Sequence, residues 1–146
     1  MHVRPLLSVR DVAASMAFYT DLLGFTPEGT LLPGTDGKPV FAGVKHGQSV
    51  VWLDHTEYDE LPPNTLLGVG VELYIALDDH ADIDGLYERV KAAGIPILSE
   101  IQDQFWGDRR FVAQDPDGYR LSVSKNVRKV SDEEMSDHTQ ANYTSE

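Results

Sequence analysis

The sequence predicts an α+β fold made of two βαβββ repeats. One strand-like pattern, a stretch with apolar residues at helical spacing and three more strand-like patterns occur twice, at residues 2–55 and 69–124. A glycine follows each helical stretch, at Gly24 and Gly94, where it can end the helix. A linker at 56–64, rich in residues that break regular structure, separates the repeats. A chain of 146 residues therefore suits one domain or two closely packed half-domains.

The first repeat is expected to begin with a strand at residues 2–9. Asp11 then stands where a helix N-cap is expected, and apolar residues follow it at helical spacing as far as Gly24. Residues 33–37 (Pro-Gly-Thr-Asp-Gly) form a turn cluster. The other strands of this repeat are expected at 25–32, 40–45 and 48–54.

The second repeat is expected to follow the same order, beginning with an apolar strand at 69–77. The polar residues 78–82 can cap the next helix, whose apolar positions begin at Ile83 and which Gly94 ends. Its other strands are expected at 95–101, 109–114 and 119–124.

Composition excludes several classes of function. The net charge is −12, from 24 acidic and 12 basic residues, so nucleic acid is not an expected partner and a cationic ligand is favoured. The absence of cysteine excludes disulfides and thiolate zinc sites. No stretch approaches the roughly 20 apolar residues that a membrane span needs, and the N-terminus lacks a signal-peptide pattern. A cytoplasmic protein without a membrane partner is expected.

Two segments carry a family resemblance. The first is residues 9–25, with Phe-Tyr at 18–19 and Leu-Gly-Phe at 23–25, and the second is Trp-Gly-Asp-Arg-Arg-Phe at 106–111, followed by Asp-Pro-Asp-Gly-Tyr at 115–119. Together they resemble the vicinal-oxygen-chelate superfamily of glyoxalases, bleomycin-resistance proteins and extradiol dioxygenases, and most of all its bleomycin-resistance-like members. An Asp-Pro-Asp-Gly turn alone is a weak signal, because many tight turns use it.

The resemblance implies a domain at 1–126, in which each repeat curls into a U-shaped mixed sheet and the two share a cleft. It leaves a polar acidic tail at 127–146, which lacks clear periodicity and is expected to be mobile or to pack against a partner subunit. Enzymes of the superfamily hold a divalent metal in the cleft through His, Glu or Gln on the first and fourth strands of each repeat. Binding members hold no metal there and sequester an antibiotic between the subunits of a dimer.

The metal positions implied by the resemblance are poorly filled in this chain. Counting from the strand ends places Arg4, Val51, Glu72 and Ser122 at them, and only Glu72 is a good ligand. No metal and no cofactor are therefore expected. A shift in strand register would offer a different set, His2, His55 and Glu72, and this alternative stays open.

The expected ligand site is instead aromatic. Trp106 stands in a polar segment and is expected in a loop, where it either stacks on a ligand or closes the end of the core. Arg109 is expected to order its turn by pairing with a carboxylate. The full set of expected ligand-binding residues is Trp106, Phe41, Trp52, Glu72, Tyr74, Arg4 and Ser122.

The leading interpretation is a homodimeric, metal-free binding protein that sequesters a flat, cationic small molecule. The alternative is a metal-dependent glyoxalase-type lyase or extradiol dioxygenase of the same superfamily. A domain that has lost both activities is a third reading. The sequence assigns no catalytic residue, because it contains no nucleophile motif and no phosphate-binding loop.

Overall fold

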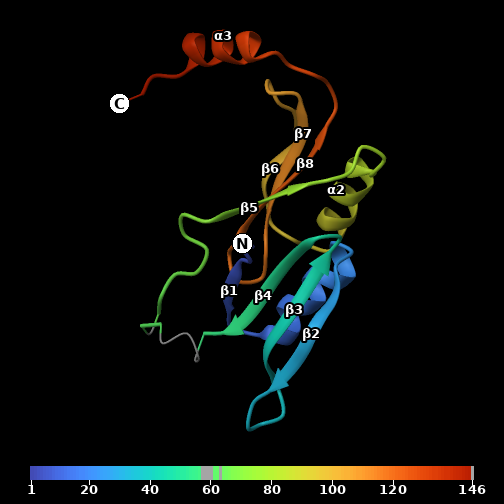
Figure 1. Ribbon diagram of the computed structural model, residues 1–146, viewed down its shortest axis with the longest axis vertical. Coiled ribbons are helices and arrows are strands. Elements are labelled where there is room, and N and C mark those ends of the chain that lie inside the picture. Colours follow the sequence, from blue (N-terminus) through green and yellow to red (C-terminus); the bar gives the residue numbers. More distant parts are fainter. Residues whose placement is uncertain (57–60, 63, 146) are drawn as a thin grey trace. The chain divides into compact units, whose positions relative to one another are not determined.

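A computed structural model describes residues 1–56, 61–62 and 64–145 and divides the chain into two compact units (Figure 1). Unit 1 comprises Met1–Val71 together with Gln114–Tyr119, and unit 2 comprises Glu72–Ala113 and Arg120–Glu146. Each unit holds one four-stranded mixed sheet with helical segments, which confirms the predicted α+β class. None of the helices in the described residues is long and apolar enough to cross a membrane.

Unit 1 contains the first βαβββ repeat. Its sheet has the order β1-β4-β3-β2, in which β1 runs parallel to β4 and the other neighbours are antiparallel. Leu7 on β1 and Leu53 on β4 are paired and almost fully buried, on the face that α1 contacts. The elements are β1 (Leu6–Val9), α1 (Val12–Ala17), the π-helical turn η1 (Phe18–Leu22), β2 (Thr26–Pro33), β3 (Pro39–His46) and β4 (Ser49–His55).

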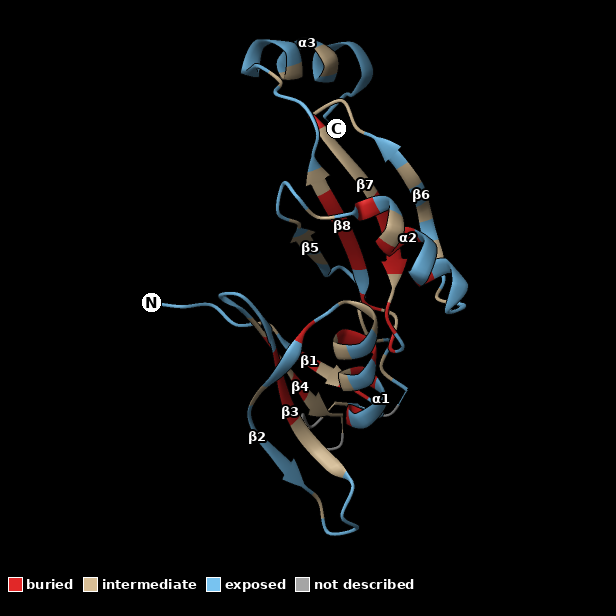
Figure 2. Ribbon diagram, turned by 90° about the vertical axis from the view of Figure 1, so that its right-hand side faces the viewer, coloured by how far each residue is buried: buried red, intermediate tan, exposed pale blue. Residues whose placement is uncertain are grey.

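Unit 2 contains the second repeat, with the equivalent strand order β5-β8-β7-β6 and a parallel β5·β8 pair. The ring of Tyr87 on α2 packs 5.2 Å from that of Phe111 on β7, centroid to centroid, so α2 covers one face of this sheet. Buried residues continue along β8, as Figure 2 shows. The elements are β5 (Glu72–Ala76), α2 (Ile83–Ala92), β6 (Ile97–Asp103), β7 (Asp108–Gln114), β8 (Arg120–Asn126) and α3 (Asp132–Asn142).

The helix starts are as predicted, and the first strand of each repeat is shorter than predicted. Asp11 and Asp82 accept hydrogen bonds from the backbone N–H groups of Ala14 and Gly85, at 2.9 Å each, and so cap α1 and α2. The first strand begins at Leu6 rather than residue 2, because Pro5 has no N–H to donate to a strand ladder. The strand β5 begins at Glu72 rather than residue 69, since Gly70 has a φ of +76° that extended backbone excludes.

The tail contains a helix, α3, which was not predicted because the tail lacks apolar residues at helical spacing. The Ser131 hydroxyl accepts a hydrogen bond from the Glu134 backbone N–H at 3.1 Å, and acidic residues fill the first turn. Carboxylates near a helix N-terminus stabilise the helix, because the N-terminus is the positive end of the helix dipole. No residue of α3 is buried. The signal in the sequence was therefore the capping pair Ser131 and Glu134 and not hydrophobicity.

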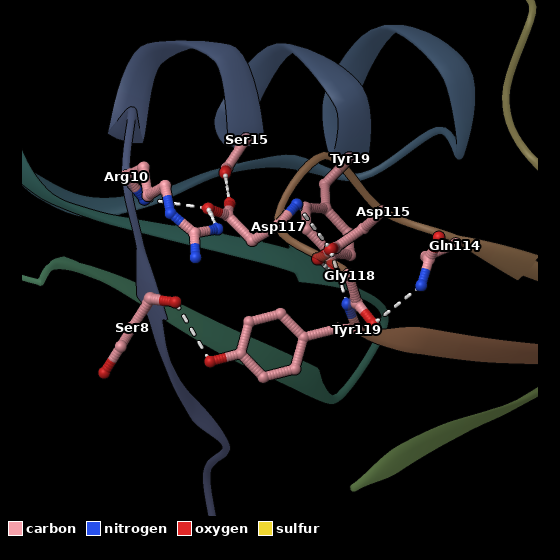
Figure 3. A network of polar contacts seen from close by, with 9 residues as sticks. All are labelled: Ser8, Arg10, Ser15, Tyr19, Gln114, Asp115, Asp117, Gly118 and Tyr119. Carbon is pink, nitrogen blue, oxygen red and sulfur yellow. Dashed lines mark hydrogen bonds and ion pairs between the residues drawn. The ribbon is translucent and has the colours of Figure 1, made fainter. Parts of the chain in front are cut away.

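The Asp-Pro-Asp-Gly turn at 115–118 belongs to unit 1, although it joins two strands of the second repeat (Figure 3). One oxygen of the Asp117 carboxylate accepts from the Arg10 backbone N–H at 2.9 Å, and the other accepts from the buried Ser15 hydroxyl at 3.0 Å. The Tyr19 hydroxyl donates to Asp115 at 2.9 Å, and the Tyr119 hydroxyl donates to the Ser8 carbonyl at 2.9 Å. This turn therefore fixes α1 and η1 against the rest of unit 1.

Burial changes the ionisation of two groups in this network. It raises the pKa of the Asp115 carboxyl, and the hydrogen bonds from Tyr119, Tyr19 and Asp117 only partly oppose it. Burial, together with the neighbouring Asp115 carboxylate, raises the pKa of the Tyr19 phenol well above its ordinary value. Tyr19 therefore acts as a hydrogen-bond donor at neutral pH.

Candidate functional site

One face of the unit 2 sheet gathers polar and aromatic side chains. In the parallel β5·β8 pair, Glu72 is aligned with Arg120 and Tyr74 with Ser122, so these side chains share a face. Arg110 reaches both Glu72 and Ser122 from β7 and therefore lies on the same face. We call this the open face of unit 2. It contains three residues of the predicted ligand set, Glu72, Tyr74 and Ser122.

The guanidinium of Arg110 occupies the centre of the open face of unit 2. It forms an ion pair with Glu72 at 2.9 Å and donates a hydrogen bond to the hydroxyl of the fully buried Ser122. Arg120 approaches the second Glu72 oxygen at 3.5 Å. Burial acts to raise the pKa of Glu72, but hydrogen bonds from Arg110 and Ser122 and the charges of both arginines outweigh it, so this pKa is lowered. The one good metal ligand of the predicted set is thus already neutralised by cations of the chain.

A carboxylate at the end of the open face, Asp108, organises the aromatic residues. It accepts hydrogen bonds from the Tyr74 hydroxyl at 2.6 Å, the Trp106 indole N–H at 3.2 Å and the Asn126 amide at 3.1 Å. Burial acts to raise its pKa, but these three bonds outweigh it and lower the pKa. All three donors are neutral, and no Lys or Arg among the described residues forms an ion pair with Asp108. A full negative charge therefore lies beside two aromatic rings.

Trp106 lies in the turn between β6 and β7, as predicted, and is half-buried. The edge of its ring meets Phe105 with 5.1 Å between centroids, and the Arg110 guanidinium carbon lies 5.9 Å from its centroid. Tyr74 nearby is 51% exposed. We call Tyr74, Trp106 and Asp108 the aromatic corner. It can hold a flat ring by stacking and attract a positive charge to it.

The remaining predicted residues, Arg4, Phe41 and Trp52, come together in unit 1. The Arg4 guanidinium carbon lies 5.1 Å from the Trp52 ring centroid, and the rings of Phe41 and Trp52 are 5.9 Å apart with an edge-on contact. Trp52 is aligned with the exposed Leu6, on the sheet face away from the buried Leu53. These three side chains therefore form a second aromatic patch with its own cation.

Val51 was expected at one of the four implied metal positions, and that placement is wrong by one residue. Val51 is 7% exposed and pairs with the fully buried Val44, so it faces the α1 side of the sheet. His55, four residues later, has the same orientation along the strand and lines a pocket of about 530 Å³ beside Arg10 and Asp11. Neither residue therefore points to the face that carries Trp52.

The donor chemistry does not fit a metal centre within either unit. No group of three His, Cys, Asp or Glu side chains in the part of the chain that the structure describes is placed to hold an ion. Arg110 and Ser122 beside Glu72 supply a cation and a neutral hydroxyl, whereas a divalent ion needs several anionic or imidazole donors converging on it.

Two residues of the site, Arg110 and Asp108, were absent from the predicted set. Both lie in the 106–111 signature, which was the available signal, but neither spacing nor residue type shows which side chains they reach. The neighbouring Arg109 behaves as predicted and pairs with carboxylates, Asp84 at 2.8 Å and Asp103 at 2.9 Å. The hydrogen bond with Arg109 lowers the pKa of Asp84.

The lowered pKa of Glu72 predicts an acid-dependent stability. A carboxyl whose folded pKa is depressed contributes stability above its ordinary pKa of 4.5, and this contribution is lost as the pH falls below that value toward the folded pKa. Glu72→Gln is therefore expected to reduce the loss of thermal stability as the pH is lowered from 5 to about 3. Melting temperatures across this range measure it, with the exposed Glu100→Gln as the matched control. Parallel pH profiles for wild type and Glu72→Gln would contradict the role of the ion pair.

The family comparison agrees with this architecture. The family model described as the Glyoxalase/Bleomycin resistance protein/Dioxygenase superfamily matches residues 2–123. The chain belongs to this superfamily. A bleomycin resistance protein of Geobacillus stearothermophilus is 30% identical to this chain over 132 residues. The match covers 85% of this chain and 96% of that protein.

Solved structures with a similar fold include both a binding protein and an enzyme. TnmS3, an antibiotic binding protein from Streptomyces sp. CB03234, matches with a TM-score of 0.64 and 22% identity over 86% of this chain and 96% of its own. Lactoylglutathione lyase from Agrobacterium tumefaciens matches with the same TM-score of 0.64 and 22% identity, over 86% of this chain and 92% of its own. A binder and an enzyme are thus equally similar in fold, and the side chains of the site must discriminate between them.

Proposed function

We propose that this protein binds a flat, cationic small molecule without a metal and acts by sequestering it. The observation that carries the proposal is the placement of Arg110, whose guanidinium neutralises Glu72 and binds Ser122. A divalent ion at these two residues would have to displace a cation already paired at 2.9 Å. Binding in place of metal catalysis is the activity that this arrangement favours.

The aromatic corner supports the choice of ligand. Tyr74 and Trp106 offer ring faces for stacking, and the Asp108 carboxylate beside them attracts a positive charge. The net charge of −12 adds a long-range attraction for cations. A relative that is 30% identical is named a bleomycin resistance protein, so a planar, cationic antibiotic is the first candidate ligand.

Self-association is part of the proposal. The strand β2 lies at one edge of the unit 1 sheet, and its Leu31 and Leu32 are 51% and 47% exposed. An exposed sheet edge with apolar side chains favours pairing with another chain. A homodimer would cover this edge.

The proposal predicts that protein treated with a chelator keeps its full binding activity. We expect metal-free bleomycin, or ethidium as a simpler planar cation, to bind such protein with an unchanged Kd, because no metal bridges ligand and protein. Isothermal titration after EDTA treatment and dialysis measures this, and elemental analysis of untreated protein accompanies it. One transition metal per subunit, lost in Glu72→Ala, would instead favour the lyase or dioxygenase alternative.

A further inference from the structure

The turn that carries Trp106 is held from outside its own hairpin. Within the hairpin, the Gln104 N–H donates to the Asp108 carbonyl at 2.7 Å and the Gly107 N–H to the Gln104 carbonyl at 3.1 Å. The chain beyond β8 then crosses this turn. The backbone N–H groups of Val127 and Arg128 both donate to the Gly107 carbonyl, at 2.9 and 3.1 Å. The turn therefore depends on residues that follow the second repeat.

Glycine at position 107 permits this crossing. Its φ is +100°, and a Cβ atom at this position would collide with the Arg128 carbonyl oxygen. The Arg128 side chain donates to the Phe105 carbonyl at 3.3 Å and also forms an ion pair with Glu134 in the first turn of α3 at 3.1 Å. One arginine thus joins the turn to the tail helix.

An aromatic contact continues from α3 to Trp106. The His138 ring stacks on Phe105 with centroids 3.9 Å apart and planes within 10° of parallel. Phe105 in turn meets Trp106 edge-on, with 89° between the ring planes. A displacement of α3 would therefore remove the support from one side of Phe105 and leave the Trp106 ring held mainly by its hydrogen bond to Asp108 and its contact with Arg110.

We propose that the C-terminal segment 126–143 positions Trp106 for ligand binding and that His138 is the residue through which α3 does so. This inference rests on the proposed function. The segment lies beyond residues 2–123, which match the family model. His138 is a positioning residue, because it acts through Phe105.

A double-mutant cycle in the full-length chain tests the inference, with ethidium as the probe. Losing one aromatic contact at the site should weaken binding roughly three- to ten-fold. We expect this loss for His138→Ala, but not for His138→Phe, which keeps a ring. Nor do we expect it for Gln140→Ala, an exposed α3 residue whose side chain donates to the Ser136 hydroxyl on the same helix. In a Trp106→Ala background, His138→Ala should have no further effect. An equal loss in that background, or none in either, would overturn the inference.

A second measurement needs no ligand and separates this inference from the proposed function. In a Trp52→Phe background, Trp106 is the only tryptophan. We expect His138→Ala to lower its fluorescence anisotropy while the melting temperature stays within a degree or two of that of the parent, since α3 buries no residue. Lowered anisotropy without ethidium binding supports the positioning role and counts against the proposed function. Unchanged anisotropy overturns the positioning role, whatever ethidium does.

Discussion

Replacing Asp117 with alanine is expected to lower the free energy of unfolding by about 3 kcal/mol. The carboxylate accepts from the Ser15 hydroxyl and the Arg10 backbone N–H, and Ser15 is fully buried. Alanine would leave that hydroxyl without an acceptor and without water, which costs about 1–3 kcal/mol in addition to the lost hydrogen bonds. The Arg10 ion pair adds little, because its side chain is 58% exposed.

For a chain of this size the expected loss corresponds to a melting temperature lowered by roughly 10 °C. Calorimetry or circular dichroism measures the shift. Asp36→Ala is the matched control, because Asp36 accepts a backbone N–H, that of Lys38, in an exposed turn. Equal small shifts for both variants would show that the Asp117 network contributes little to stability.

Trp106→Ala is expected to weaken the binding of planar cations by roughly ten-fold or more. Stacking on one ring contributes on the order of 0.5–1.5 kcal/mol beyond area burial, and a cation over the ring adds about as much. Because Trp106 lies half-buried in a turn, its removal should change the melting temperature only slightly. Titration with ethidium and with metal-free bleomycin measures the effect.

The contribution of charge to this binding should decrease as salt shortens the Debye length below about 8 Å. Leu66→Ala provides the control for nonspecific apolar contacts, since Leu66 is 78% exposed and lies in unit 1. If Trp106→Ala unfolds the protein, or if it binds ethidium as wild type does, Trp106 closes the end of the core and is not a ligand contact.

Local patterns made the fold predictable. An aspartate that accepts a backbone N–H caps each of α1 and α2, and Gly24 adopts a positive φ just after the helical stretch formed by α1 and η1. Hydrophobic periodicity did not predict the change from α1 to the π-helical turn η1. Tyr19 lies in η1 and its hydroxyl donates to Asp115. That contact joins residues 96 positions apart, and no local pattern encodes it.

The candidate site was less predictable, because strand register decides which side chains share a face. Counting four residues from the turn glycine places Ser122 on the open face of unit 2 but places Val51 on the buried face of unit 1. The turns of the two hairpins differ in length. Between β3 and β4, His46 pairs directly with Ser49 around a short turn, whereas the turn between β7 and β8 spans residues 115–118. A difference of one residue reverses the direction of every side chain along a strand.

The turn at 115–118 also constrains how the chain folds as it leaves the ribosome. Arg10 and Ser15 find their hydrogen-bond acceptor in Asp117, which is 107 and 102 residues further along the sequence. The first repeat can form its strands early, but the Ser15 hydroxyl on its helix lacks its native acceptor until residue 117 has been synthesised. Contacts this distant in sequence slow folding, because a long loop must close before they stabilise anything. The N-terminal half is therefore expected to stay partly folded until residues 115–118 have been translated.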